Sequence, residues 1–403
     1  MRILCPTFWY PEHAGDIHAT YVHDINRHFV QLGHEVVVVT PQIDDAAARE
    51  TIDGVDVVRF QTDIPADLRY GKVAQSRIGP VSKLRRLLAM ATYLRKQYKE
   101  SCRIGAALRP DVIHGHWAIP TGPAVVLAAR KLGVPSIITM HGGDVYVNPE
   151  QGYDFPTRWY VRPVLRRTLC AADALTAISD DCRQHALKAG AAADKINVIM
   201  NGADLRRFSP GKATVSNYGS QMIFACRQLI PRKGIRYLIE ATAMLANEYP
   251  DAQLVVAGDG IERESLEQLA RNLNISDRVH LIGWVPNASL PDFFRSAVMS
   301  VIPSIEEGFG IPAAEAMGCE LPVIATDAGG LPEVVDDGVT GFVVAREDSR
   351  SLADAMRKLL ENDRLRRDFG IAGREKALAE FDWLSTARSM EALFGSLRRQ
   401  EQS

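Results

Sequence analysis

The 403-residue sequence lacks the features that define several common classes of protein. Its six cysteines are scattered without a C-x-x-C pair, which excludes the usual zinc and dithiol motifs. Its longest apolar runs, such as residues 35–40, have the length of a strand and are too short to span a membrane. Residues 1–6 read as a first strand, without the apolar core and cleavage site of a secretory signal. We therefore expect a cytoplasmic protein with reduced cysteines.

Charge is nearly balanced overall, with a formal net charge of −2, but it is uneven along the chain. Residues 69–109 hold eleven Lys or Arg and one acid, Glu100. Apolar residues at 84, 87, 88, 91 and 94 have helical spacing, which predicts a basic amphipathic helix here. Two interpretations fit this segment: a solvated surface helix, or a surface that docks on anionic lipid or on a phosphorylated acceptor. No nucleic-acid recognition motif accompanies the charge, so no nucleic-acid partner is expected.

Short β-branched runs alternate with helical patterns, which predicts parallel α/β structure. Residues 206–220 are rich in Ser, Pro, Gly, Lys and Asn, which indicates a linker between two doubly wound domains. We expect an N-terminal domain at 1–205, a second domain at 221–380 and a C-terminal helical segment at 381–403. The predicted strands are Arg2–Thr7, Glu35–Thr40, Val55–Phe60, Asp111–His116, Ser136–His141, Ala174–Ser179 and Asn197–Met200, then Met222–Arg227, Leu254–Gly258, Val279–Trp284, Met299–Pro303, Pro322–Thr326 and Gly341–Val344. A helix is predicted from Asp16 to Leu32, ending at Gly33.

The stretch from Glu307 to Glu315 is the most informative part of the sequence. Its two glycines, Gly308 and Gly310, oppose helix formation, whereas Pro312 suits the first turn of a helix. Glu307 is therefore expected at the end of a strand and Glu315 on the helix that follows. Free backbone N–H groups between them would suit an anionic, hydroxyl-rich ligand.

A second pair of residues, Arg227 and Lys233, brackets another predicted strand-to-helix turn. An arginine supplies a two-pronged donor and a lysine a point charge, while the helix start adds its dipole. This combination suits a diphosphate. Ligands of doubly wound sheets bind at the carboxyl ends of the strands, where both motifs are expected to lie.

The E-x(7)-E pattern and the R-x(5)-K pattern together resemble the donor-site signature of the retaining glycosyltransferases of family 4. The resemblance implies the GT-B fold, in which two Rossmann-like domains face each other across a cleft and the segment 381–403 returns to the first domain. It also implies transfer of a hexosyl unit from a UDP- or GDP-linked sugar to an acceptor hydroxyl. Cys226 stands where relatives usually have glycine. No D-x-D occurs in the sequence, so Arg227 and Lys233 are expected to do the work of a metal ion, and neither a metal nor a cofactor is predicted.

The same resemblance implies roles for individual residues. The expected catalytic residues are Glu307, His141, Arg227 and Lys233. The expected donor-binding residues are Arg227, Lys233, Glu307, Gly308, Phe309, Gly310, Ile311, Glu315 and Val285, with Glu315 on the ribose and Val285 beside the base. In the first domain Gly15, Asp16, His116 and Asp144 are expected near the acceptor, with Asp16 standing in place of the second glycine of a Gly-Gly pair.

The acceptor is the less defined substrate. The basic segment at 69–109 favours a lipid-linked or membrane-associated glycan in envelope or exopolysaccharide synthesis, with the protein peripheral to the inner face of the membrane. Two alternatives stay open: transfer to a small soluble acceptor, and another reaction in the same fold, such as nucleotide-sugar epimerisation.

Overall fold

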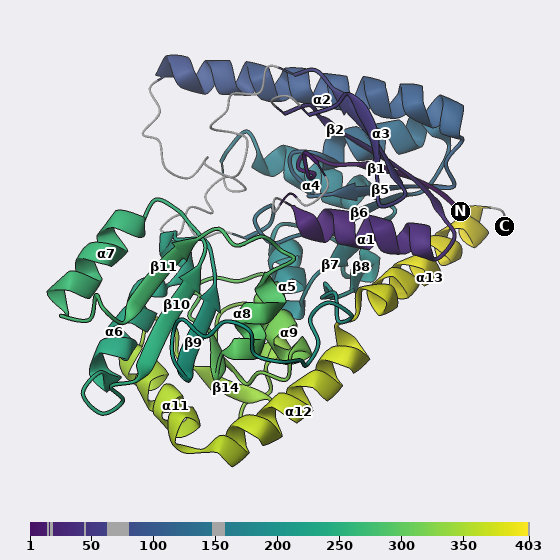
Figure 1. Ribbon diagram of the computed structural model, residues 1–403. Coiled ribbons are helices and arrows are strands. Elements are labelled where there is room, and N and C mark those ends of the chain that lie inside the picture. The colour runs from purple at the N-terminus through teal and green to yellow at the C-terminus, as the bar shows by residue number, and fades with distance from the viewer. Residues whose placement is uncertain (14–15, 17–18, 44–45, 63–79, 147–157, 402–403) are drawn as a thin grey trace. The chain divides into compact units, whose positions relative to one another are not determined.

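The computed structural model describes residues 1–13, 16, 19–43, 46–62, 80–146 and 158–401. The chain forms two compact units (Figure 1). Unit 1 comprises Met1–Met200 and Trp383–Ser403, and unit 2 comprises Asn201–Asp382. Each unit has a central sheet with helices packed against it.

The sheet of unit 1 has eight strands in the order β3-β4-β2-β1-β5-β6-β7-β8. Neighbouring strands run parallel, except that β3 is antiparallel to β4. The strand order changes direction between β1 and β5, so the carboxyl ends of these strands flank a switch point, where ligands of such sheets bind. The strands are β1 (Arg2–Pro6), β2 (Glu35–Pro41), β3 (Arg49–Ile52), β4 (Val55–Phe60), β5 (Val112–His116), β6 (Ser136–Met140), β7 (Ala174–Ala177) and β8 (Ile196–Val198).

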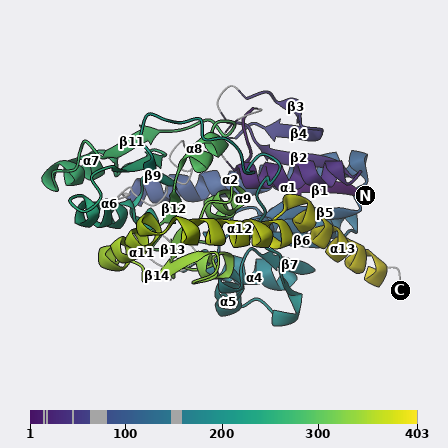
Figure 2. The same cartoon turned by 60° about the horizontal axis from the view of Figure 1, so that its bottom comes forward.

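Helices cover both faces of this sheet (Figure 1). Helix α2 packs with α3, and α1 packs with α13, the last helix of the chain. Figure 2 shows α4 and α5 close together near β7. The helices of unit 1 are α1 (Thr20–Gln31), α2 (Pro80–Leu108), α3 (Gly122–Leu132), α4 (Arg162–Ala171), α5 (Asp180–Lys188) and α13 (Trp383–Glu401), with a 3-10 turn η5 at Ala193–Lys195.

Helix α13 is tied into unit 1 by apolar and charged contacts. The ring of Phe394 lies 5.4 Å from that of Phe29 on α1, measured between centroids. Arg398 Nη2 forms an ion pair with Asp111 Oδ1 at 3.0 Å. Unit 1 is therefore assembled from two stretches of chain that are separated by the whole of unit 2.

The sheet of unit 2 has six strands in the order β11-β10-β9-β12-β13-β14, and all its paired strands are parallel. Its switch point lies between β9 and β12. The strands are β9 (Gln221–Cys226), β10 (Ala252–Ala257), β11 (Val279–Gly283), β12 (Met299–Ile302), β13 (Val323–Thr326) and β14 (Gly341–Val344). The helices are α6 (Ile235–Leu245), α7 (Arg263–Asn272), α8 (Leu290–Ser296), α9 (Ile311–Gly318), α10 (Leu331–Val334), α11 (Ser349–Glu361) and α12 (Asp363–Glu380), with a 3-10 turn η6 at Pro231–Lys233.

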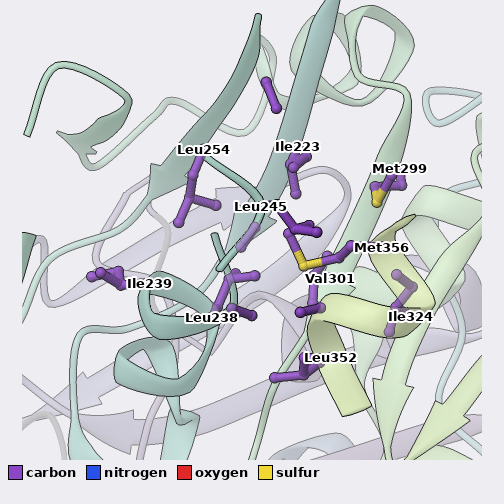
Figure 3. Packing of buried hydrophobic residues seen from close by; sticks show 14 of the residues in the cluster. Ile223, Leu238, Ile239, Leu245, Leu254, Met299, Val301, Ile324, Leu352 and Met356 are labelled. Carbon is purple, nitrogen blue, oxygen red and sulfur yellow. The ribbon is translucent and has the colours of Figure 1, made fainter. Parts of the chain in front are cut away.

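The core of unit 2 lies between the sheet and helices α6 and α11 (Figure 3). Leu238 of α6 and Met356 of α11 are fully buried against Ile223 of β9 and Val301 of β12. Each such side chain contributes about 1.5–3 kcal/mol when it is removed from water. These contacts hold β9 and β12 side by side, and those two strands flank the switch point.

The structure differs from the sequence predictions at three places. Strand β3 is missing from the predicted set, because a four-residue antiparallel edge strand has little periodicity to detect. Helix α1 begins at Thr20, four residues after the predicted start at Asp16. The predicted linker at 206–220 belongs to unit 2, since the chain passes from unit 1 to unit 2 at Asn201.

The segment 206–220 is irregular but firmly attached to unit 2. The guanidinium of Arg295 on α8 donates to the carbonyls of Arg207 and Ser209, at 3.0 and 2.7 Å. The hydroxyl of Ser296 accepts from the backbone N–H groups of Thr214 and Val215 at 3.1 and 3.0 Å. Its composition correctly indicated the absence of helix and strand, but it carried no information about these contacts.

Substitution of one glycine of unit 2 tests how closely two loops of this unit approach each other. Gly258 follows β10 with φ +141°, and a Cβ there would overlap the carbonyl of Arg227. Gly258→Ala should therefore lower the free energy of unfolding by more than the roughly 1–2 kcal/mol of backbone strain alone. Calorimetry of unit 2 unfolding measures this, with Gly338→Ala as the control, because Gly338 has φ +72° and no atom within 4 Å of an added Cβ. Equal losses in the two variants would contradict the predicted overlap.

Candidate functional site

Three charged side chains meet at the switch point of unit 2. Arg227 follows β9, Glu307 follows β12, and Lys233 ends the turn η6 before α6. Lys233 Nζ lies 2.8 Å from Glu307 Oε2, and Arg227 Nη1 lies 3.1 Å from the same oxygen. We call these three residues the charged triad. The structure thus brings together the cations of one predicted motif and the first carboxylate of the other.

Backbone hydrogen bonds fix the loop that carries Glu307. The N–H of Ile305 donates to the carbonyl of Arg232 at 2.8 Å, which joins this loop to the turn η6. The N–H of Gly330 donates to the carbonyl of Glu307 at 3.1 Å. Glu307 Oε1 accepts from the N–H of Gly308 at 3.2 Å, and Oε2 accepts from the hydroxyl of Ser304 at 3.3 Å. The carboxylate is therefore held in one position by neighbours on several turns.

The triad is shielded from water. The side chains of Arg227, Lys233 and Glu307 are 5, 14 and 13% exposed. Burial opposes ionisation of Glu307, but the charges of Lys233 and Arg227 outweigh it and lower the pKa of this carboxyl to about 2. Burial lowers the pKa of Lys233 to about 8, although the Glu307 carboxylate opposes this shift. At neutral pH all three groups are charged, so the triad keeps one excess positive charge.

Arg227 is also incompletely satisfied. Its Nη1 contacts Glu307, whereas its buried Nε and Nη2 have no hydrogen-bond partner among the described residues. A buried guanidinium donor without a partner is costly, and most such groups in folded proteins are paired. These donors, with the excess positive charge, are what an anionic ligand at the switch point would use.

The remaining predicted donor residues lie on α9, before it, or after β11. Helix α9 begins at Ile311 directly after Gly310, and half-buried Glu315 projects from its second turn. Burial, and then the nearby Glu315 carboxylate, raise the pKa of the Cys226 thiol to about 12, so Glu315 lies near the start of the Arg227 loop.

Two further predicted donor residues differ in what they can offer a ligand. The ring of Phe309 is buried and packs against Phe381 at 5.4 Å between centroids, so only its backbone could contact a donor. Val285 follows β11 and is half-buried, beside the more exposed Trp284.

A second cluster lies at the switch point of unit 1. His116 ends β5 and His141 follows β6, and their rings stack with 5.1 Å between centroids. His116 Nδ1 lies 2.9 Å from His141 Nε2, so one of these nitrogens carries the shared hydrogen. Burial lowers the pKa of His141 to about 3 and that of His116 well below its usual value, so both rings are neutral at physiological pH. His141 Nδ1 and His116 Nε2 have no partner among the described residues.

Aromatic side chains that the sequence did not identify surround this pair. Trp117 contacts His141 at 5.0 Å between centroids, and Tyr21 contacts His141 at 4.9 Å. Trp9, from the loop after β1, packs on Trp117 at 4.8 Å. The signal available in the sequence was a tryptophan within a few residues of two different predicted strand ends.

The other predicted residues of unit 1 are placed as follows. Asp144 is buried, and its carboxylate accepts from the N–H groups of Ala118 at 2.6 Å and His141 at 3.1 Å. Burial raises the pKa of Asp144 to about 6 against these hydrogen bonds. Its carboxylate thus ties the loop after β5 to the loop after β6. Asp16 accepts from the N–H of Glu12 at 2.8 Å and closes the loop after β1, while Gly15 lies outside the described residues.

Within the ranges that the structure describes, no three or more His, Cys, Asp or Glu side chains are grouped so that they could hold a metal ion. The imidazole rings of His114 and His116 lie 4.5 Å apart, measured between centroids. His114 Nε2, however, is hydrogen-bonded to the Thr139 hydroxyl at 2.7 Å.

Known families cover both units of the chain. Residues 212–376 match the family described as glycosyl transferases group 1, and residues 18–202 match the glycosyl transferase 4-like domain. The first match contains the whole charged triad, and the second contains His116 and His141.

Relatives of full length are also known. A D-inositol 3-phosphate glycosyltransferase of Frankia alni is 30% identical, covering 94% of this chain and 93% of its own. An MMP α-(1→4)-mannosyltransferase of Mycolicibacterium hassiacum is 27% identical over 98% of both chains.

Solved structures share the fold. Sucrose-phosphate synthase from Thermosynechococcus elongatus has a TM-score of 0.77 at 22% identity, over 98% of this chain and 99% of its own. HepE of Anabaena, solved in complex with UDP-glucose, has a TM-score of 0.75 at 20% identity, over 98% of this chain and all of its own. The protein is a glycosyltransferase with two Rossmann-like units of the GT-B fold, and it belongs to the group 1 glycosyl transferases.

Proposed function

We propose that the protein transfers a hexosyl unit, with retention of configuration, from a nucleoside diphosphate sugar to an acceptor hydroxyl. The observation that carries the proposal is the pair of buried, unpartnered donors on Arg227, within the described part of the chain, beside Lys233 at the switch point of unit 2. Two cations and two open N–H donors are what a diphosphate requires. HepE, which has the same fold, was solved with UDP-glucose, so UDP is the first nucleotide to test.

The chemistry follows from where charge develops. When the bond between the sugar and the diphosphate breaks, negative charge builds on the leaving oxygen. Fixed cations aimed at that oxygen stabilise the transition state more than the ground state. In this proposal Arg227 and Lys233 supply that stabilisation without a metal ion.

Glu307 is proposed as a positioning residue that contacts donor sugar hydroxyls. A carboxylate whose pKa is lowered to about 2 by two cations is a weak base and a weak nucleophile. This favours front-face displacement, in which the leaving phosphate takes the acceptor proton, over a covalent step at Glu307. His141, neutral and with its Nδ1 unpartnered among the described residues, is proposed to hydrogen-bond a substrate hydroxyl.

The proposed acceptor is a lipid-linked or membrane-associated glycan, with the protein at the inner face of the membrane. The observation behind it is the exposed side of α2, where Leu87 and Leu88 are followed by exposed Arg95 and Lys99. Apolar and basic residues on one helix suit an anionic membrane surface. Among the described residues, none of the helices is long and apolar enough to cross a membrane.

A small soluble acceptor is the second candidate. Its support is the Frankia relative, which is named a D-inositol 3-phosphate glycosyltransferase, and two further relatives whose names contain the same words. The two candidates share the donor site, so tests of the acceptor leave the donor proposal unaffected.

Donor binding is tested by Arg227→Gln. UDP at 100 times its dissociation constant should stabilise the wild type by about 2.7 kcal/mol in a thermal melt, with EDTA present. Loss of the charge-assisted hydrogen bonds should raise the dissociation constant of the variant by roughly tenfold to a hundredfold. Arg236→Gln is the matched control, because exposed Arg236 pairs with Glu240 on the surface of α6. An unchanged UDP response in Arg227→Gln would refute the role of the triad.

The pH dependence of UDP binding tests Lys233 separately. Since Lys233 is protonated below about pH 8 and neutral above it, UDP should bind progressively more weakly as the pH rises from 7 to 9. Lys233→Arg keeps its charge over this range and should flatten the dependence. Calorimetric titration of both proteins measures it, and the ligand's own ionisation cancels in the comparison. Parallel pH profiles would show that Lys233 does not hold the phosphates.

The proposed association with a membrane is tested by binding to vesicles. Vesicles that contain phosphatidylglycerol should bind the wild type, and Arg95→Gln/Lys99→Gln should weaken binding about thirtyfold, at about 1 kcal/mol for each cation. Vesicle flotation measures this, with Arg364→Gln/Arg367→Gln on α12 of unit 2 as the control. Absence of binding by the wild type would remove the membrane acceptor, and transfer to inositol phosphate would then be assayed.

A further inference from the structure

A pocket of about 570 Å³ lies in unit 1 between α4 and the carboxyl end of α5, two helices that Figure 2 shows close together. It belongs to neither of the two clusters described above. Four of its eight lining residues are cations, and none is acidic. The lining residues are Arg162, Pro163, Arg166, Arg167, Cys170, Lys188, Ala189 and Gly190. We call this the arginine pocket.

Among the described residues, the charge of the arginine pocket is not paired with carboxylates. Helix α4 carries Arg162, Arg166 and Arg167 and no acid along its ten residues. Like charges four positions apart, as at Arg162 and Arg166, destabilise a helix by about 0.2–0.5 kcal/mol. In the part of the chain that the structure describes, no carboxylate forms an ion pair with any of the four cations.

Acidic residues on the neighbouring helix do not neutralise the pocket. Asp180 of α5 pairs with Arg183 of its own helix at 3.1 Å. Asp181 stands beside Asp180 in the first turn of α5. Both carboxylates of α5 therefore lie at its amino end, and the pocket lies at the other end of that helix.

The walls of the pocket are held by specific contacts. The aliphatic part of Arg166 packs against Gly190, where an added Cβ would lie 3.1 Å from Arg166 Cγ. Lys195 Nζ donates to the carbonyls of Cys170 and Ala172, at 2.8 Å each, and adds positive charge at the end of α4. The four cations of the pocket are exposed, so an anion from solution can reach them.

We propose that the arginine pocket binds a phosphate group, either of a free diphosphate or phosphate ester or of a phospholipid head group. Guanidinium forks match the oxygens of a phosphate in pairs, and several of them around one concave site favour a multiply charged anion. Trp159, three residues before Arg162, is 85% exposed, and an exposed aromatic ring beside cations is common at membrane surfaces. The proposal does not rest on the donor site, which lies in unit 2.

Cys170 provides a readout inside the pocket. Its thiol is exposed, whereas Cys102 on α2 is half-exposed and lies outside the pocket lining. Iodoacetamide labelling of the full chain, followed by mass spectrometry, should show that inorganic pyrophosphate slows alkylation of Cys170 but not of Cys102. In Arg166→Gln/Arg167→Gln, the pyrophosphate concentration needed for half-protection should rise at least about tenfold. Arg364→Gln/Arg367→Gln is the control for loss of two surface charges.

A second arm distinguishes the source of the phosphate. Flotation with vesicles that contain phosphatidylglycerol is compared between the wild type and Arg166→Gln/Arg167→Gln. Weaker vesicle binding by the variant identifies a lipid head group, and loss of pyrophosphate protection alone identifies a free phosphate. Unaltered Cys170 labelling by pyrophosphate together with equal vesicle binding would overturn the proposal. UDP binding in unit 2 should be the same in both proteins, which verifies that the variant is folded.

Discussion

The charged triad of Arg227, Lys233 and Glu307 constrains everything around the switch point of unit 2. Three charges shielded from water are stable only when each lies within contact distance of an opposite charge. Glu307 meets that condition with its two cations at 2.8 and 3.1 Å, whereas Arg227 keeps two donors without partners in the described structure. Hydrogen bonds between the loops after β9 and β12, such as that from the N–H of Ile305 to the carbonyl of Arg232, hold the three charges in this arrangement.

Much of this fold was predictable from sequence. Buried parallel strands read as short β-branched runs, so Val55–Phe60 and Gly341–Val344 were predicted with the bounds that the structure has. The antiparallel edge strand β3 was not predicted, because a short, half-exposed strand has only a weak pattern of apolar residues. The segment 206–220 was assigned to a linker because composition reports flexibility of the isolated chain, and not the hydrogen bonds that Arg295 makes to it.

The candidate site residues were predictable where a motif lies within one strand-to-helix turn, because residue type and spacing along the chain then indicate the site. Arg227 ends one predicted strand, Lys233 and Glu307 each follow a predicted strand, and neighbouring strands bring the three residues together. The surroundings of His141 were not predictable, because Tyr21 and Trp117 contact it and Trp9 packs on Trp117, from three separate parts of the chain. The burial of Phe309 against Phe381 was hidden for the same reason, since the partner is distant in sequence.

The position of α13 has a consequence for synthesis of the protein. Unit 2 is continuous in sequence, whereas the core of unit 1 needs Phe394 to cover Phe29. On the ribosome all of unit 2 emerges before residues 383–401 do, so the second unit can reach its native packing while the first still exposes an apolar groove on α1. Exposed apolar surface on an incomplete domain is the usual starting point of aggregation and of chaperone binding. Vectorial synthesis thus reverses the order of completion: the unit that is translated first is the last to close its core.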